Sequence, residues 1–184
     1  TQGDTERIIG NWLQKTKKRS EIILATKITG KGFKAIRNGE PISVSNLRPA
    51  LEGSLKRLKT EYIDLYQLHW ANRGSYHFRQ NWDYDPSVQE KELDEMYNIL
   101  SELDKFVKEG IIRTIGLSNE TAWGTIQFSN IAKENNFPEI VTIQNEYSLM
   151  CRHFDLDLAE VCHHEKIGLL SFSPLACGLS LIHI

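Results

Sequence analysis

The fold of this chain is decided by the stretch EYIDLYQLHW, residues 61–70. It is a short apolar run that ends in a histidine, and the turn-prone residues Asn72, Arg73 and Gly74 follow it. Such a run, bounded by turn residues, is typical of a buried strand. In a parallel β/α protein, side chains at the carboxyl ends of the strands face the active-site mouth. The sequence therefore predicts that His69 lies at such a mouth, where an imidazole can polarise a substrate oxygen.

Four more apolar runs end in a residue with useful chemistry. One lies upstream and ends in Lys27, and three lie downstream; the four runs cover residues 22–27, 115–119, 141–145 and 169–175. Helical patterns separate the runs, because apolar residues recur there every three or four positions. Strands that alternate with helices imply a parallel sheet with right-handed crossovers.

The expected helices have recognisable ends and apolar faces. The first covers residues 5–17, with an apolar stripe of Ile8, Ile9, Trp12 and Leu13. Ser45 is predicted to cap the second, with Pro49 inside its first turn and one leucine face. The third begins near Glu92 and stops at Gly110, and its buried side is expected to hold Leu93, Met96, Tyr97, Leu100, Leu103 and Val107. Two further helices are expected over residues 121–135 and 155–165.

This order predicts an α/β protein, specifically an incomplete (β/α)₈ TIM barrel. A complete barrel takes roughly 250 residues, whereas this chain has 184 residues and five clear strand signals. No change of composition divides the chain, so a single domain is expected. A doubly wound open sheet is the alternative, and it would call for a glycine-rich GxGxxG turn after the first strand. No such motif is present, and the barrel is favoured.

Composition excludes several classes of protein. The formal net charge is −2, which gives no argument for binding nucleic acid or a membrane surface, and the basic cluster 15–19 is predicted to be a solvated helix end. No apolar run approaches the roughly 18–20 residues of a membrane span. Three cysteines without CxxC spacing fit reduced thiols in a cytoplasmic protein. The histidines outside the strand ends lack partners at metal-binding spacing, so no metal is expected.

The ordered strand-end residues identify a resemblance. From about Thr5 to Gly178 the chain resembles the aldo-keto reductase family, and within it the bacterial Tas-type enzymes and the potassium-channel β-subunits. The resemblance implies an NAD(P)H-dependent carbonyl reductase on a (β/α)₈ barrel, which reduces a small-molecule aldehyde or ketone to an alcohol. It also implies that NADP(H) is the cofactor.

The resemblance assigns two catalytic residues to this chain. The family uses Asp, Tyr, Lys and His, of which Lys27 matches the lysine and His69 matches the histidine. An ammonium beside a tyrosine stabilises its phenolate, and the histidine orients the carbonyl. The matching Asp and Tyr are expected upstream of Thr1, so the isolated 184-residue chain is expected to be inactive.

The resemblance also assigns cofactor contacts. Ser118, Asn119 and Gln144 match the residues that hydrogen-bond the nicotinamide carboxamide. Phe172 matches the aromatic ring that stacks on the nicotinamide, and the loop of Ser173 and Leu175 matches the one that approaches the pyrophosphate. From the residues alone, Ser118-Asn119 is equally a capping or turn pair for the next helix.

Several points stay open at this stage. The reductase domain is expected to cover residues 1–178, and LSLIHI at 179–184 resembles a translated sequencing adapter and is expected to be non-native. The aromatic-rich stretch 71–89 is expected to shape the substrate pocket. An alternative function is a channel-β-subunit-like protein that binds the nucleotide with little turnover. The sequence does not predict the substrate, the oligomeric state or a preference for NADP over NAD.

Overall fold

The computed structural model describes residues 3–73 and 91–181, and its centre is one parallel sheet. The strands are β1 (Ala25–Ile28), β2 (Ile63–Leu68), β3 (Ile112–Ser118), β4 (Ile140–Glu146) and β5 (Gly168–Phe172). They pair in chain order, each parallel to the next. The five strands predicted from the sequence are confirmed, and so is their arrangement as part of a barrel.

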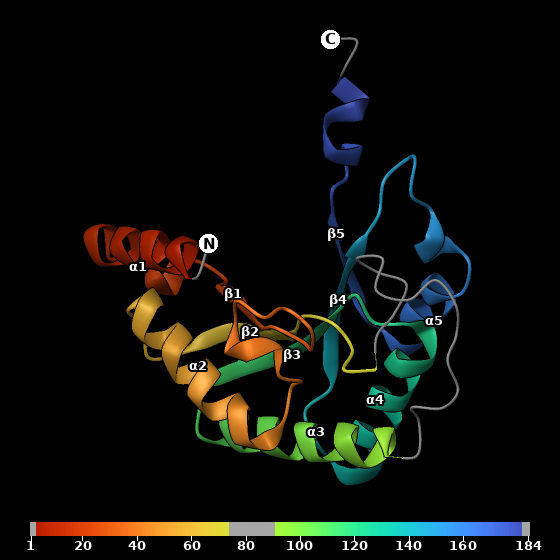
Figure 1. Cartoon of the computed structure of the whole chain (residues 1–184), viewed down its shortest axis with the longest axis horizontal. Coiled ribbons are helices and arrows are strands. Elements are labelled where there is room, and N and C mark those ends of the chain that lie inside the picture. The colour runs from red at the N-terminus through yellow and green to blue at the C-terminus, as the bar shows by residue number, and fades with distance from the viewer. Residues whose placement is uncertain (1–2, 74–90, 182–184) are drawn as a thin grey trace.

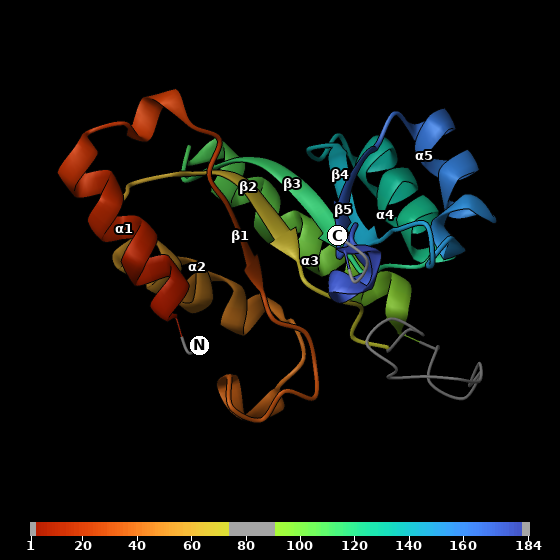
Figure 2. The ribbon, with the colours of Figure 1, turned by 90° about the horizontal axis from the view of Figure 1, so that it is seen from above.

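Five α-helices lie along one side of this sheet, the first of them resting on the second beyond the edge strand β1 (Figures 1 and 2). They are α1 (Asp4–Thr16), α2 (Val44–Leu58), α3 (Glu92–Lys108), α4 (Ala122–Asn135) and α5 (Leu158–Glu165). Each helix contacts the next along the chain, from α1 to α5. This is the arrangement that right-handed crossovers produce, because each one returns the chain to the same face. The polar side chains of the candidate site, described below, lie on the other face of the sheet.

The hydrophobic core lies between the helices and the sheet. Leucines of α2 and α3 meet the outward-facing side chains of β2 and β3, and the fully buried members include Leu47, Leu51, Leu100, Leu103, Phe106, Tyr66, Ile115 and Leu117. Burying a large apolar side chain contributes roughly 1.5–3 kcal/mol relative to leaving it in water. This layer therefore fixes the sheet, and with it the positions of the strand ends.

Helix α1 packs against α2 through a glycine. A Cβ atom on Gly10 would lie 2.3 Å from the Arg57 carbonyl oxygen, so only glycine lets the two backbones come this close. The buried stripe of α1 is consequently centred on Gly10 and Leu13. The predicted stripe was partly wrong, since the side chains of Ile8 and Trp12 are 68% and 44% exposed.

Helix α2 begins two residues earlier than predicted. Ser43, not Ser45, is the N-cap, and the Asn46 side chain accepts a hydrogen bond from the Ser43 N–H at 3.0 Å. This capping box satisfies two backbone donors and outweighs the alternative start. Pro49 therefore lies in the second turn of the helix, not the first.

Other boundaries also differ from the sequence prediction. Leu93 and Tyr97 of α3 are 49% and 42% exposed, because the buried stripe of this helix runs through Met96, Leu100 and Leu103. The last predicted helix is divided, with a short 3-10 turn His153–Asp155 before α5. Gly110, with φ 76°, ends α3 as predicted. The aromatic stretch expected at 71–89 lies mostly outside the described residues.

The basic cluster at 15–19 is not wholly solvated. Arg19 turns inward at the amino end of β2 and pairs with Asp64 at 2.7 Å, with side-chain exposures of 16% and 8%. Asp64 also accepts from the Leu24 N–H at 2.9 Å and pairs with Arg113. Among the described helices, none is both long and apolar enough to cross a membrane.

Candidate active site at the carboxyl ends of the strands

Strand register places the predicted site residues on one face of the sheet. Lys27 is opposite Gln67, Gln67 is opposite Gly116, and Gly116 is opposite Thr142. Paired residues of parallel strands point to the same side, and the next residue on that side lies two positions further along. Ser118 is paired with Gln144, and His69 follows Leu68, the partner of Leu117. Lys27 thus lies one layer below His69, Ser118 and Gln144.

A bulge in β4 makes this alignment possible. Ile115 pairs with Ile140, but Gly116 pairs with Thr142, so Val141 is an extra residue in the ladder. Without it, Ile143 would face Ser118 and the Gln144 amide would miss the site. Bulges commonly re-aim side chains next to functional sites.

Burial perturbs the pKa of both Lys27 and His69, and the charge of Lys27 acts on His69 as well. Burial lowers the pKa of the Lys27 ammonium below its usual range. Burial, with a further contribution from the positive charge of Lys27, lowers the pKa of His69 to about 4. His69 is therefore a neutral imidazole at pH 7, and a neutral imidazole can donate a hydrogen bond without transferring a full charge. Its main chain is fixed by a 3.0 Å bond from the His69 N–H to the Ile28 carbonyl oxygen.

The turn after β3 is held by a dense set of hydrogen bonds. Ser118 Oγ donates to the Gln144 carbonyl oxygen at 2.9 Å. The Asn119 side-chain amide donates to the His69 carbonyl oxygen and to Ser118 Oγ, each at 3.0 Å. Asn119 itself adopts the left-handed conformation, with φ 52°. The turn is thereby attached to the strand before it and the strand after it.

Gln144 is the member of this group with an open polar end. Its side chain is half-buried and makes no hydrogen bond to any other residue in the described ranges, whereas Ser118 and Asn119 are 2% and 0% exposed. A primary amide offers two donors and an acceptor, which matches a carboxamide ligand. Phe172 ends β5 on the same face, two residues beyond Leu170, the partner of Gln144.

Ser173 and Leu175 lie apart from this group. They follow β5 in a turn where Ser173 has φ 51° and accepts a weak bond from the Cys177 thiol at 3.8 Å. Leu175 is 47% exposed. Among the described residues, neither hydrogen-bonds Ser118 or Gln144; both lie in the loop after β5, to which the sequence analysis assigned the pyrophosphate.

Two participants were missed by the sequence analysis. Asn145 accepts from the Asn119 N–H at 2.7 Å and donates to the Glu120 carbonyl oxygen at 3.2 Å. Arg73 forms a buried ion pair with Glu120, which directly follows Asn119. The available signals were that Asn145 directly follows Gln144 and that Arg73 lies four residues after His69, but the direction of a polar side chain near a site residue is not visible before the fold is known.

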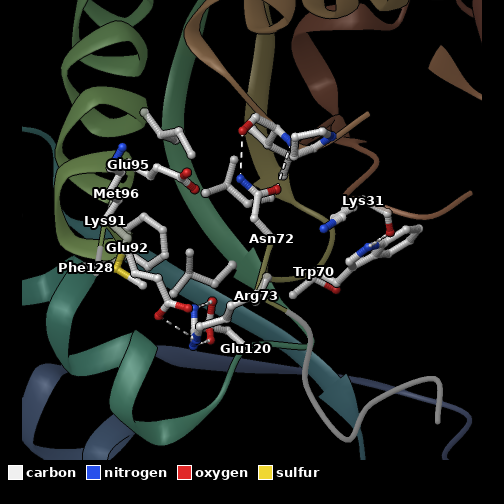
Figure 3. A pocket seen from close by; sticks show the side chains of 17 residues that line it. Lys31, Trp70, Asn72, Arg73, Lys91, Glu92, Glu95, Met96, Glu120 and Phe128 are labelled. Carbon is white, nitrogen blue, oxygen red and sulfur yellow. Dashed lines mark hydrogen bonds and ion pairs between the residues drawn. The ribbon is translucent and has the colours of Figure 1, made fainter. Parts of the chain in front are cut away.

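A cavity of about 170 Å³ lies on the other side of these strand ends, between the sheet and helices α3 and α4 (Figure 3). Its lining is mixed, with Met96 and Phe128 beside Glu92 and Lys91, and Ser118 is the predicted site residue that reaches it. Lys27 and Gln144 are not among its lining residues. In residues 3–73 and 91–181 no three His, Cys, Asp or Glu side chains gather as a metal site would require.

Comparisons with known proteins agree with this geometry. A sequence model of the Aldo/keto reductase family matches residues 1–181. Protein tas of Escherichia coli is 42% identical over 97% of this chain and 52% of its own length. An aldo-keto reductase of Babesia bovis is 34% identical over 87% of the chain and 60% of its own length. Norsolorinic acid reductase A of Aspergillus parasiticus is 29% identical over 96% of the chain and 42% of its own length. The chain thus spans about half the length of the curated relatives it matches, and it belongs to the aldo/keto reductase family.

Proposed function

We propose that the full-length protein encoded by the native gene reduces aldehydes or ketones to alcohols with NADPH. The observation that supports this most directly is the convergence of Lys27, His69, Ser118 and Gln144 on the same face and the same end of one parallel sheet. Family membership and the reductases among the relatives support the same reaction class. Residues 1–178 form a part of the catalytic barrel in this proposal.

The catalytic role of this chain is to orient and polarise the substrate carbonyl. A bound nicotinamide supplies the hydride, which is delivered to the carbonyl carbon. His69, neutral at pH 7 because its pKa lies near 4, donates a hydrogen bond to the carbonyl oxygen on which negative charge develops. Lys27 provides a positive charge one layer below, where it stabilises a neighbouring phenolate. The resemblance places the tyrosine that gives the proton outside these 184 residues.

The cofactor is held on the same face of the sheet by residues at the ends of β3, β4 and β5. The open Gln144 amide hydrogen-bonds the carboxamide, with Ser118 and Asn119 as the buried wall beside it. Phe172 offers an aromatic ring for stacking on the nicotinamide. Ser173 and Leu175 approach the pyrophosphate from the loop after β5. The three free thiols fit a reducing compartment, and we place the protein in the cytoplasm.

The test of this proposal is Lys27→Met in the full-length protein. Losing a group that assists proton transfer typically costs 10²–10⁴ in rate, so we expect the rate of aldehyde reduction with NADPH to fall by about 100-fold or more. Lys34→Met, which removes an exposed ammonium from the loop that follows, is the matched control and should leave the rate unchanged. Equal rates for wild type and Lys27→Met would refute the catalytic assignment.

A second experiment, NADPH binding compared with single-turnover oxidation, distinguishes this proposal from the channel-β-subunit-like alternative. That alternative requires the full-length protein to bind NADPH with ordinary affinity and to oxidise it only slowly in a single turnover with saturating aldehyde. Fast single-turnover oxidation excludes it.

A further inference from the structure

The turn that carries Ser118 and Asn119 is followed directly by a buried acidic residue, Glu120. Glu120 is 3% exposed, next to the fully buried Asn119 in its left-handed conformation. The Glu120 carboxylate accepts a hydrogen bond from the Thr121 N–H at 2.7 Å. This backbone donor and the Thr121 hydroxyl, at 3.3 Å, do not offset the desolvation of a carboxylate, so the turn needs a cation to hold Glu120 in place.

Arg73 is that cation. One of its terminal nitrogens bonds Glu120 Oε2 at 3.3 Å, and the other bonds Glu120 Oε1 and, at 3.0 Å, the hydroxyl of Thr121. Figure 3 shows the guanidinium pointing at Glu120, with Glu92 on its other side. The Arg73 side chain is only 11% exposed. The bidentate geometry needs a planar fork of donors, which a lysine ammonium cannot reproduce.

The same contacts fix helix α4. The Thr121 hydroxyl accepts from the Gly124 N–H at 3.2 Å and so caps the helix. Arg73 therefore binds both Glu120 in the turn and Thr121, the N-cap of helix α4.

Arg73 also belongs to the short segment 69–73 that begins with His69. At one end of this segment the Asn119 side chain donates to the His69 carbonyl oxygen, and at the other end Arg73 binds Glu120. The segment and the turn thus form a closed loop of contacts. Because both ends are tied, a shift of Glu120 has to be transmitted to Asn119, His69 or both.

The segment is tied on its other side as well. Trp70 donates through its indole N–H to the Lys31 carbonyl oxygen at 2.9 Å. Asn72 pairs with the main chain of Ile42 through two bonds, of 2.8 and 2.7 Å. Segment 69–73 therefore connects the loop after Lys27 to the turn after β3, and Arg73 is its only charged contact to that turn among the described residues.

We propose that Arg73 is a positioning residue for the nicotinamide site, which holds the Ser118–Asn119 turn in register with His69 by neutralising Glu120. This inference rests on the proposed function, because it concerns how the cofactor site is kept in shape. Arg73 touches neither the cofactor nor the substrate in this scheme and acts through Glu120. A purely structural ion pair would instead stabilise the fold and leave the cofactor site unaffected.

The experiment compares two ligands in the full-length protein. NADPH engages the nicotinamide site, whereas 2′,5′-ADP carries the adenosine end alone. For Arg73→Lys we expect the Kd for NADPH to rise about tenfold or more, the effect of weakening hydrogen bonds to a charged group, and the Kd for 2′,5′-ADP to change less than about twofold. Both are measured by fluorescence titration beside a thermal melt.

Arg19→Lys is the matched control. Arg19 is also a buried arginine paired with a carboxylate, but its partner Asp64 lies near the amino end of β2, five residues or about 16 Å before His69 at roughly 3.3 Å per residue. It should lower the melting temperature while leaving the ratio of the two Kd values as in wild type. If Arg73→Lys does not fold, the ratio of the two Kd values is measured in the triple variant Arg73→Met, Glu120→Gln and Glu92→Gln, because Glu92 also pairs with Arg73, at 3.6 Å, and would otherwise keep an unpaired buried charge.

The outcomes are distinct. Selective loss of NADPH binding in the Arg73 variant supports the positioning role. Unchanged NADPH affinity, equal weakening of both ligands, or the same selective loss in Arg19→Lys overturns it. Failure of the wild-type protein to bind NADPH would appear before any variant is made; it would refute the proposed function, and this inference with it.

Discussion

The protonation state of His69 leads to a prediction that can be worked through in numbers. An unperturbed imidazole has a pKa near 6.5 and is about one-quarter protonated at pH 7. In the fold, burial and then the charge of Lys27 lower the pKa of His69 to about 4. Only about one molecule in a thousand then carries the proton at pH 7.

This difference also affects stability. Each pH unit between the folded and unfolded pKa corresponds to about 1.4 kcal/mol, so the separation of 6.5 and about 4 corresponds to up to about 3 kcal/mol. Between pH 6.5 and about 4, His69 is protonated in the unfolded chain and stays neutral in the folded chain. The fold therefore loses stability as the pH falls from 6.5 towards 4, and it loses nothing from this group above pH 7.

The assay is an NMR titration of the full-length protein with isotope-labelled histidine, in which His69→Gln identifies the His69 signal. We expect that signal to stay at its neutral position from pH 8 down to about 5.5, and to titrate near 6.5 when the protein is unfolded in concentrated urea. In Lys27→Met the midpoint should rise but stay well below 6.5, because burial is the larger cause. A midpoint near 6.5 in the folded wild type would refute the reasoning and remove the neutral donor from the proposed mechanism.

Three further predictions concern stability of the full-length protein. Gly10→Ala should destabilise it by about 1–3 kcal/mol, because the new Cβ would meet backbone atoms. Gly53→Ala should stabilise it by up to about 1 kcal/mol, because its Cβ would meet only the flexible end of Arg57. The free energy of unfolding of both variants is measured by denaturant titration, and changes of the same sign would contradict the reasoning. Burial raises the pKa of Glu92, so the fold loses stability as the pH rises through that pKa. Glu92→Gln should flatten the dependence of melting temperature on pH above the ordinary glutamate pKa, and an unchanged slope would count against it. Asp64→Asn breaks a buried pair and should cost about 3–5 kcal/mol by urea unfolding, with a loss below 1 kcal/mol as the contrary result.

Much of the candidate site could be proposed from the sequence because its residues lie within short local patterns. His69 and Lys27 come at or beside the ends of apolar runs, and the rule that strand ends face the active site applies to any parallel sheet. Capping was harder, since Ser43 and Ser45 are both good N-cap residues and only the Asn46 side chain decides between them.

The exposed faces of helices could not be predicted from periodicity. Trp12 and Tyr97 follow the helical period of their segments as well as Leu13 and Leu100 do, yet they are exposed. Which edge of an apolar stripe is covered depends on how closely the neighbouring helix approaches. For α1 that approach is set by Gly10.

The sequence by itself determined the order of strands and helices, the parallel sheet and the polar residues at its carboxyl ends, because all of these follow from patterns within about twenty residues. Only the tertiary structure decided that the β4 bulge turns Gln144 toward Ser118, that burial makes His69 neutral, and that Arg73 meets Glu120. These three depend on contacts between segments some 25 to 50 residues apart. Desolvation and ion pairing arise only when such segments are packed together, and no local pattern of residues encodes them.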